Sequence, residues 1–158
     1  MENKVRKIIR FVDCKSDVPI VEFILGNGDS AYAVVDTGSE TTLFDFNLIL
    51  GEHKLEFPLK KTKNKINFVG VQQDTEVPLV KTSPTIRFID ADNNNGYLYV
   101  KIDDAIFISM ANLTQHMKDQ YGVDMAISAI LGSDMLSKLN AEVNYQKKEM
   151  IIDYDIPC

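Results

Sequence analysis

The stretch Ala33–Leu43, AVVDTGSETTL, runs from an apolar β-type segment into a short polar segment that begins at Asp36. The residues before Asp36 favour a buried strand, so the carboxylate would stand on a rigid support. Gly38 would let the backbone turn sharply and would remove the Cβ that keeps a ligand away. The polar segment therefore predicts either a catalytic loop or an ordinary turn between two strands, because Asp, Gly and Ser each favour turns.

A second segment, Ala129–Leu136 (AILGSDML), repeats this layout with an apolar run, a glycine and residues suited to starting a helix. Together the two segments resemble the aspartic proteases, in which an Asp-Thr/Ser-Gly loop is crossed by an apolar-apolar-Gly segment to form a ψ-shaped core. Asp36–Ser39 matches the first motif and Ile130–Gly132 matches the second, while Ser128–Ala129 stands where family members often have Asp-Gly. The chain contains one Asp-Thr-Gly, so the resemblance is to the single-lobe, retropepsin-like proteases.

The resemblance implies peptide-bond hydrolysis by two carboxylates that share one proton, one activating a water and the other polarising the scissile carbonyl. One chain supplies one such carboxylate, so a homodimer would place Asp36 and its copy across a two-fold axis. The implied catalytic residues are Asp36, Thr37 and Gly38, with the Thr37 hydroxyl locking the two loops together. A turn hydroxyl that is bonded locally is the alternative role for Thr37.

The resemblance also implies residues that bind the substrate. The Ser39 hydroxyl would donate a hydrogen bond to the Asp36 carboxylate. Glu40 would bind the substrate main chain, and a surface glutamate is its alternative role. Ile130, in the second motif, is a further candidate for substrate binding.

A flap that closes over the substrate is expected after the catalytic loop, and its tip usually needs a glycine. The candidates are Val69, Gly70 and Val71, where a glycine interrupts a β-type pattern. The same pattern is typical of a bulge in an ordinary edge hairpin, because a single glycine often marks a bulge in a strand.

The composition is that of an ordinary folded chain, with 45% hydrophobic and 25% charged residues, which excludes a largely disordered one. The 158 residues are expected to form one domain, 1–158, large enough to bury a core. A net charge of −6 with scattered basic residues argues against a nucleic-acid surface and leaves peptide or small-molecule partners open, while the resemblance implies a peptide or protein substrate. The one basic cluster, Lys60–Lys65, predicts a solvated loop.

Neither a metal nor another cofactor is expected. Cys14 and Cys158 are too few and too far apart for a disulfide framework, and His53 and His116 have no partners at ligand spacing. The first residues lack the apolar core of a signal peptide, and no apolar run approaches membrane-spanning length. The sequence therefore predicts no membrane insertion and, by default, a cytoplasmic protein.

Strand patterns dominate the chain, and two helices are expected, one from a cap at Asn112 to Gly122 and one from a cap at Ser133 to Leu139. Turn residues predict hairpins at Gly26–Asp29 and at Asp92–Gly96. The strand patterns cover Val5–Val12, Pro19–Leu25, Ser30–Val35, Lys65–Gln73, Val77–Ile89, Tyr97–Ile102, Ala105–Met110, Met125–Leu131, Ala141–Tyr145 and Met150–Tyr154. The fold class is all-β, and the resemblance makes it a retropepsin-like acid protease barrel with a ψ-loop core and one or two short helices.

The predicted function is that of an aspartic endopeptidase, active as a homodimer with one Asp36 from each subunit. A catalytically silent module of the same fold, which binds peptides or partner proteins, is the alternative. An unrelated β-barrel, in which Asp36–Ser39 is only a turn, is a third interpretation.

Overall fold

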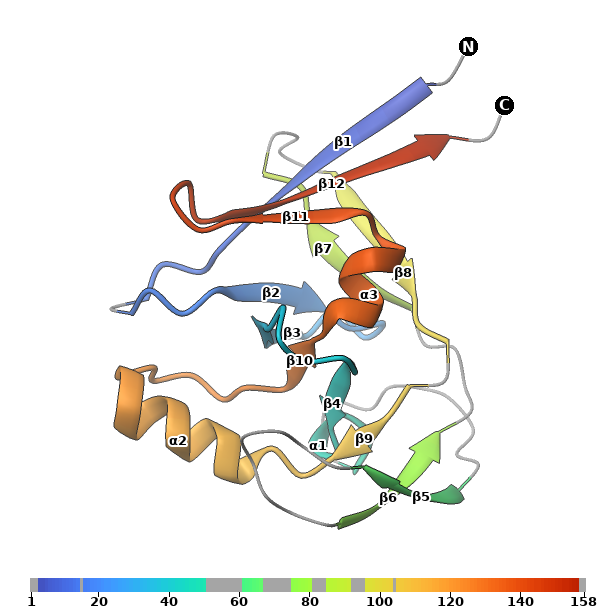
Figure 1. Ribbon diagram of the computed structural model, residues 1–158, viewed down its shortest axis with the longest axis vertical. Coiled ribbons are helices and arrows are strands. Elements are labelled where there is room, and N and C mark those ends of the chain that lie inside the picture. The colour runs from blue at the N-terminus through green and yellow to red at the C-terminus, as the bar shows by residue number, and fades with distance from the viewer. Residues whose placement is uncertain are drawn as a thin grey trace.

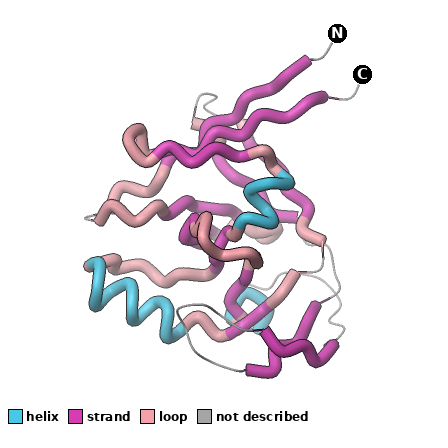
Figure 2. Tube along the Cα trace, viewed as in Figure 1, coloured by secondary structure: helices cyan, strands magenta, loops and turns pink. Residues whose placement is uncertain are grey.

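The computed structural model describes residues 3–14, 16–50, 61–66, 75–80, 85–91, 96–103 and 105–156, and most of their regular structure is β-sheet. The strands form a seven-stranded sheet, a three-stranded sheet and a two-stranded hairpin (Figure 1). The helices among these residues are few, as Figure 2 shows, and two of them lie where the sequence predicts helices. The all-β fold class is therefore confirmed.

The bounds of the elements are as follows. The strands are β1 (Asn3–Arg10), β2 (Ile20–Ile24), β3 (Ser30–Val35), β4 (Leu43–Asp45), β5 (Lys61–Ile66), β6 (Thr75–Val80), β7 (Thr85–Ile89), β8 (Tyr97–Lys101), β9 (Phe107–Ile108), β10 (Ala129–Leu131), β11 (Ala141–Asn144) and β12 (Glu149–Ile156). The helices are α1 (Asn47–Leu50), α2 (Ala111–Tyr121) and α3 (Ser133–Lys138).

The seven-stranded sheet has the order β8-β7-β2-β3-β10-β4-β9. Strand β10 pairs parallel with β3 and antiparallel with β4, so it lies between two strands that follow each other in the chain. The connection from β3 to β4, residues 36–42, is named the Asp36 loop below. A strand inserted between the two arms of this loop is the ψ-shaped core that the resemblance to aspartic proteases implies.

Strand β3 is covered on both faces, which gives the Asp36 loop its support. Ala31, Ala33 and Val35 lie in one core cluster with the phenylalanines of the neighbouring strands. Tyr32 and Val34, on the opposite face, pack against a second cluster that includes Met117 of α2. The strand that ends at Asp36 is therefore held between two layers of apolar side chains, as its sequence predicts.

Both predicted hairpins are present. Strands β2 and β3 pair antiparallel across the turn at Gly26–Asp29, where Gly28 has a φ of +91° and Asp29 donates its backbone N–H to the Asn27 side chain at 2.9 Å. Strands β7 and β8 pair antiparallel as well. Local turn chemistry decides the first hairpin, which is why the sequence predicts it. Residues 92–95 of the second predicted turn lie outside the described residues.

The two ends of the described chain form one sheet. Strand β1 pairs antiparallel with β12, which pairs with β11 as the predicted last hairpin. Asp90, after β7, holds β1 in place, because its carboxylate lies 3.3 Å from the Lys7 ammonium and is 4% exposed. The three-stranded sheet is thereby fixed to the end of the β7–β8 hairpin.

Some predicted boundaries are wrong. Helix α2 begins at Ala111, one residue before the predicted cap Asn112, and no side chain caps it. It ends at Tyr121, and Gly122 follows with a left-handed φ of +67°. Residue Gly132, not Ser133, occupies the cap position of α3. The basic stretch predicted as a loop forms β5, paired with β6. No described helix is long and apolar enough to cross a membrane.

Candidate active site

Asp36 follows β3 directly, and its backbone donates to the Leu131 carbonyl of β10 at 3.0 Å. The Gly38 N–H donates to Oδ1 of the Asp36 carboxylate at 3.0 Å, which closes a tight turn. A Cβ added at Gly38 would lie 3.3 Å from the same Oδ1, so glycine lets the turn stay close to the carboxylate. Because the Asp36 side chain is exposed, the turn presents a carboxylate to solvent from a fixed backbone.

Thr37, Gly38 and Glu40 are exposed beside Asp36. Within the described residues, neither the Thr37 hydroxyl nor the Glu40 carboxylate has a hydrogen-bond partner. The alternative role of Thr37 requires a hydrogen bond from its hydroxyl within the turn, and the described residues contain no such bond. Both side chains face solvent on the same stretch of loop as the candidate catalytic carboxylate.

The predicted hydrogen bond from Ser39 to Asp36 is wrong for this structure. The Ser39 hydroxyl donates to the Thr41 carbonyl at 2.9 Å instead. A hydroxyl has one proton to donate, so this bond replaces the expected one. Ser39 shapes the far side of the loop and does not act on the carboxylate.

Ser39→Ala should leave the pH dependence of any Asp36-dependent activity unchanged and should lower the free energy of unfolding by about 1 kcal/mol. The reason is that the lost bond belongs to the loop backbone. The measurements are a pH–rate profile and a denaturant titration of both proteins. A profile that moves to higher pH would instead place the hydroxyl on the Asp36 carboxylate.

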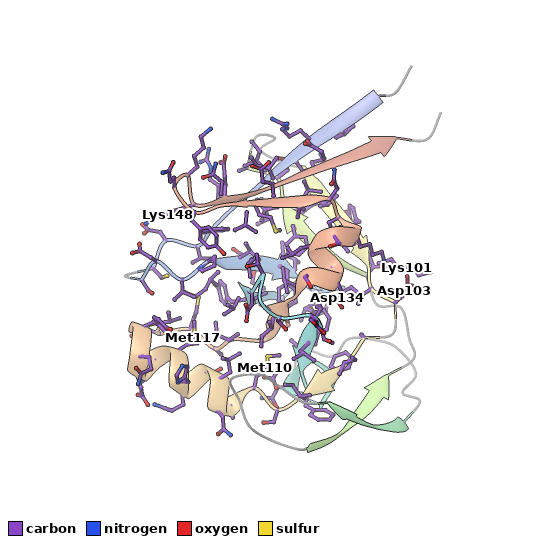
Figure 3. All side chains as sticks on the ribbon, viewed as in Figure 1. Lys101, Asp103, Met110, Met117, Asp134 and Lys148 are labelled. Atoms are coloured by element: carbon purple, nitrogen blue, oxygen red, sulfur yellow. The ribbon has the colours of Figure 1, made fainter. Side chains whose placement is uncertain are left out.

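Thr42 and Asp134 fasten the Asp36 loop to the segment that follows β10. The Asp134 carboxylate accepts from the Thr42 hydroxyl at 2.6 Å and from the Thr42 N–H at 3.1 Å. The same hydroxyl accepts from the Gly132 N–H at 3.0 Å. Figure 3 shows Asp134 at the start of α3, beside the loop. These two residues are not among the predicted site residues, because their partners are 90 or more positions away in the chain.

Gly132 lies so close to the loop that a side chain would not fit. A Cβ there would lie 2.7 Å from the Thr41 carbonyl carbon and 2.8 Å from the Ser39 and Thr41 carbonyl oxygens. The Ser133 N–H also donates to the Ser39 carbonyl at 2.7 Å. The glycine of the second motif is therefore a packing requirement of the loop, since its φ of −89° is accessible to any residue.

Thr42→Val should lower the free energy of unfolding by about 2 kcal/mol, because it keeps the shape of the side chain and removes a buried hydroxyl from two polar partners, the Asp134 carboxylate and the Gly132 N–H. Chemical denaturation measures the change. The matched control is Thr41→Val in the same loop, since the Thr41 hydroxyl has no partner among the described residues. Equal losses in the two variants would contradict the role given to Thr42.

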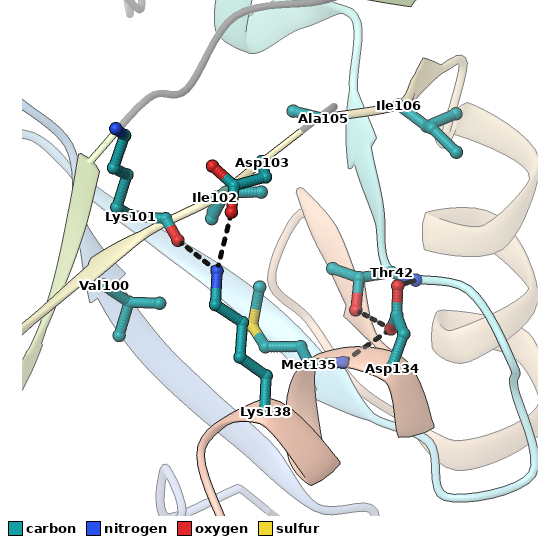
Figure 4. A pocket seen from close by; sticks show the side chains of 10 residues that line it. All are labelled: Thr42, Val100, Lys101, Ile102, Asp103, Ala105, Ile106, Asp134, Met135 and Lys138. Atoms are coloured by element: carbon teal, nitrogen blue, oxygen red, sulfur yellow. Dashed lines mark hydrogen bonds and ion pairs between the residues drawn. The ribbon is translucent and has the colours of Figure 1, made fainter.

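A pocket of about 240 Å³ adjoins the far end of the Asp36 loop (Figure 4). Thr42 and Asp134 form part of its wall, and Lys138 reaches across to the Lys101 carbonyl at 3.0 Å and to the Asp103 carboxylate at 3.2 Å. Neither Asp36 nor Thr37 lines it. The pocket therefore contacts the Asp36 loop at its anchoring residue Thr42 and not at the candidate catalytic residues of the loop.

The remaining predicted site residues are Ile130 and the flap candidates. Ile130 is half-buried in β10, pairs with Val34 and Leu43, and packs against the second core cluster. The flap candidates Val69, Gly70 and Val71 fall in the range 67–74, which lies outside the described residues. Among the residues that are described, no group of three or more His, Cys, Asp or Glu side chains is placed to hold a metal ion.

Searches against protein-family models and against curated protein sequences found no match. Among solved structures, a retropepsin-like aspartic protease from Rickettsia conorii matches with a TM-score of 0.53 at 14% identity, covering 99% of this chain and 97% of that chain. The EIAV protease complexed with the inhibitor HBY-793 matches with a TM-score of 0.42 at 16% identity, covering 80% and 92% of the two chains. The retroviral protease-like domain of Ddi1 from Leishmania major matches with a TM-score of 0.45 at 10% identity, covering 89% and 93%.

At these identities the matches indicate the fold alone. Of the three, the Rickettsia protein has a TM-score above 0.5, so the assignment of the fold is based on it. The match covers nearly the whole of both chains. This chain therefore has the retropepsin-like fold.

Proposed function

We propose that this chain is an aspartic endopeptidase whose active site is assembled from two copies of the chain. The observation that supports the proposal is the exposed Asp36 carboxylate, held by the Gly38 N–H on a loop that is clamped to β10 and α3. A structural turn does not need an exposed carboxylate on such a restrained support, whereas a catalytic group does.

In the proposed dimer the two Asp36 carboxylates share one proton, because like charges held close together do not both ionise readily. The ionised carboxylate takes a proton from the water that attacks the scissile carbonyl carbon. The protonated one donates to the carbonyl oxygen as charge develops there. The Gly38 N–H engages Oδ1, and Oδ2 has no partner among the described residues, so it is available for this chemistry.

The other predicted residues take supporting roles in the proposal. The exposed Thr37 hydroxyl would bond across the two-fold axis to the second loop, and Glu40 would bind the substrate main chain. Residues 1–158 act as one domain in this scheme, and each domain supplies half of a site. A cytoplasmic location stays a prediction from the sequence.

Specific activity should fall as the protein is diluted through the dissociation constant of the dimer, because the site exists only when two chains meet. The measurement is the rate of peptide cleavage per chain over a wide range of protein concentration, with sedimentation to follow the dimer. A tandem protein, in which two copies are joined by a flexible linker, is the control, and its activity per chain should not change on dilution.

Two outcomes would contradict the proposal. Constant specific activity from a monomer would require a mechanism with one Asp36. A stable dimer without any cleavage of a diverse peptide library would favour the catalytically silent module.

A further inference from the structure

Aromatic and cationic side chains gather on the outer face of the β7–β8 hairpin. Among the described residues, three of the five large apolar or aromatic side chains that are exposed lie here: Ile89 (43%), Tyr97 (39%) and Tyr99 (63%). The register pairs Ile89 with Tyr97 and Arg87 with Tyr99, which places all four on one face. The alternate residues of both strands are buried in the core, so this face is the solvent side of the sheet.

Arg87 lies on this face, and no described residue accepts a hydrogen bond from it. Its guanidinium carbon is 4.7 Å from the centroid of the Tyr97 ring, and its Nε is buried without a hydrogen-bond partner. Within the described chain no carboxylate is paired with it. A buried N–H without an acceptor costs free energy, and a carboxylate from a partner would satisfy the guanidinium with charge-assisted bonds.

The backbone of β8 offers hydrogen bonds along one edge. Strand β8 is at the end of the sheet order, with β7 as its one described neighbour. The Asp90 N–H donates to the Gly96 carbonyl at 3.0 Å, and bonded pairs alternate in antiparallel strands. Tyr97, Tyr99 and Lys101 therefore direct their backbone N–H and C=O groups away from β7.

The contact of Lys138 agrees with this direction. Its ammonium donates to the Lys101 carbonyl at 3.0 Å from outside the sheet, so that end of the edge already has a donor. Lysines that cover an edge in this way protect it from unwanted pairing. The edge at Tyr97 and Tyr99 has no such contact with any described residue outside the sheet.

We propose that the edge and outer face of β8, around Tyr97 and Tyr99, dock an extended acidic segment of a partner protein. The segment adds as a further strand, and backbone bonds to Tyr97 and Tyr99 supply the register. Its side chains on the outer face then lie beside the two tyrosines, with a carboxylate directed to Arg87 and a second one to the exposed Lys101. This surface goes beyond the proposed peptidase activity and does not depend on it.

A second copy of this chain fits the same edge less well. Its β8 has the sequence YLYVK, which would bring tyrosines and a lysine to the edge but no carboxylate for Arg87. A second β8 would also bring another lysine to the face that holds Arg87 and Lys101, whereas such a cationic face attracts an acidic segment. Charge complementarity therefore favours a different, acidic partner.

The test uses two synthetic seven-residue peptides, one in which glutamate alternates with valine and one in which lysine replaces each glutamate. The full-length Asp36→Asn protein is the parent, so that the probe is not cleaved. Fluorescence anisotropy should show that the glutamate peptide binds at least about tenfold more tightly than the lysine peptide. Hydrogen exchange should slow at the Tyr97 and Tyr99 amides when the glutamate peptide is bound.

Three variants separate the contributions of charge, ring and backbone. Arg87→Gln should reduce the preference for glutamate over lysine. Tyr99→Ala removes the ring and keeps the N–H, whereas Tyr99→Pro also removes the outward N–H, which an edge strand tolerates, so proline should weaken binding more than alanine. Tyr145→Ala, at an exposed tyrosine outside this face, should bind like the parent.

Several results would overturn the proposal: equal affinity for the two peptides, an unchanged preference in Arg87→Gln, or slowed exchange away from Tyr97 and Tyr99. Self-association that Tyr99→Ala abolishes, without binding of the glutamate peptide, would assign the edge to a second copy and would also overturn it. If Tyr99→Pro does not fold, Arg87→Gln and the exchange measurement decide the matter.

Discussion

Asp36→Asn should lower kcat/KM for peptide hydrolysis by about 10³-fold or more, because an amide cannot take a proton from water. The fold should be retained, since the asparagine Oδ1 can still accept from the Gly38 N–H, which lies 3.0 Å from the carboxylate oxygen in the parent chain. Cleavage of a peptide library, followed by mass spectrometry, measures the activity. Thermal unfolding of the same samples measures the fold.

The matched control for this loss is Asp124→Asn. Asp124 is an exposed acidic residue whose carboxylate lies 3.8 Å from the Lys118 ammonium, outside the candidate site. The Asp124→Asn substitution changes the net charge by the same amount as Asp36→Asn and should leave the rate of peptide cleavage unchanged. Near wild-type activity in Asp36→Asn would end the peptidase proposal, while the assignment of the fold would stand.

Gly132→Ala should lower the free energy of unfolding by about 3 kcal/mol, at the upper end of the usual cost of overpacking. The added Cβ would lie 2.7 to 2.8 Å from three atoms, all of which belong to the backbone of the Asp36 loop. A backbone cannot rotate away as the end of a flexible side chain can, so the loop or β10 must shift. Urea denaturation with an unchanged m-value is the measurement.

The control is Gly26→Ala, in the turn between β2 and β3. A Cβ at Gly26 meets no atom within 4 Å, and its φ is not in the left-handed region. Its free energy of unfolding should therefore stay within about 1 kcal/mol of the wild-type value. If Gly132→Ala were as stable as this control, the backbone at Gly132 would not lie as close to the Asp36 loop as the structure indicates.

The sequence predicts those parts of the fold that are determined by residues close together in the chain. The turn at Gly26–Asp29 contains its own hydrogen bonds, and β3 has the apolar pattern of a strand covered on both faces. The pairing of Asp36–Ser39 with Ile130–Gly132 depends on a family resemblance, because nothing local places one segment on the other. The described strands nevertheless cross as that resemblance implies.

The parts that the sequence does not predict depend on distant partners. The Ser39 hydroxyl bonds the Thr41 carbonyl, an acceptor that lies outside the Asp36–Ser39 motif. Asp134 looks like an ordinary first-turn helix residue, yet it holds Thr42, 92 positions earlier. Ser133 already lies within α3, and the extended Gly132 before it occupies the cap position, so α3 begins one residue earlier than expected.

The insertion of β10 between β3 and β4 has a consequence for the time at which the site forms. Asp36 is translated early, but its loop is anchored by residues 90 and 92 positions after Thr42. Contacts this distant in sequence form late in folding, because a long loop must close before they are gained. A nascent chain that has passed Asp36 but not Asp134 lacks the anchor, so we expect no cleavage-competent half-site until most of the chain has left the ribosome.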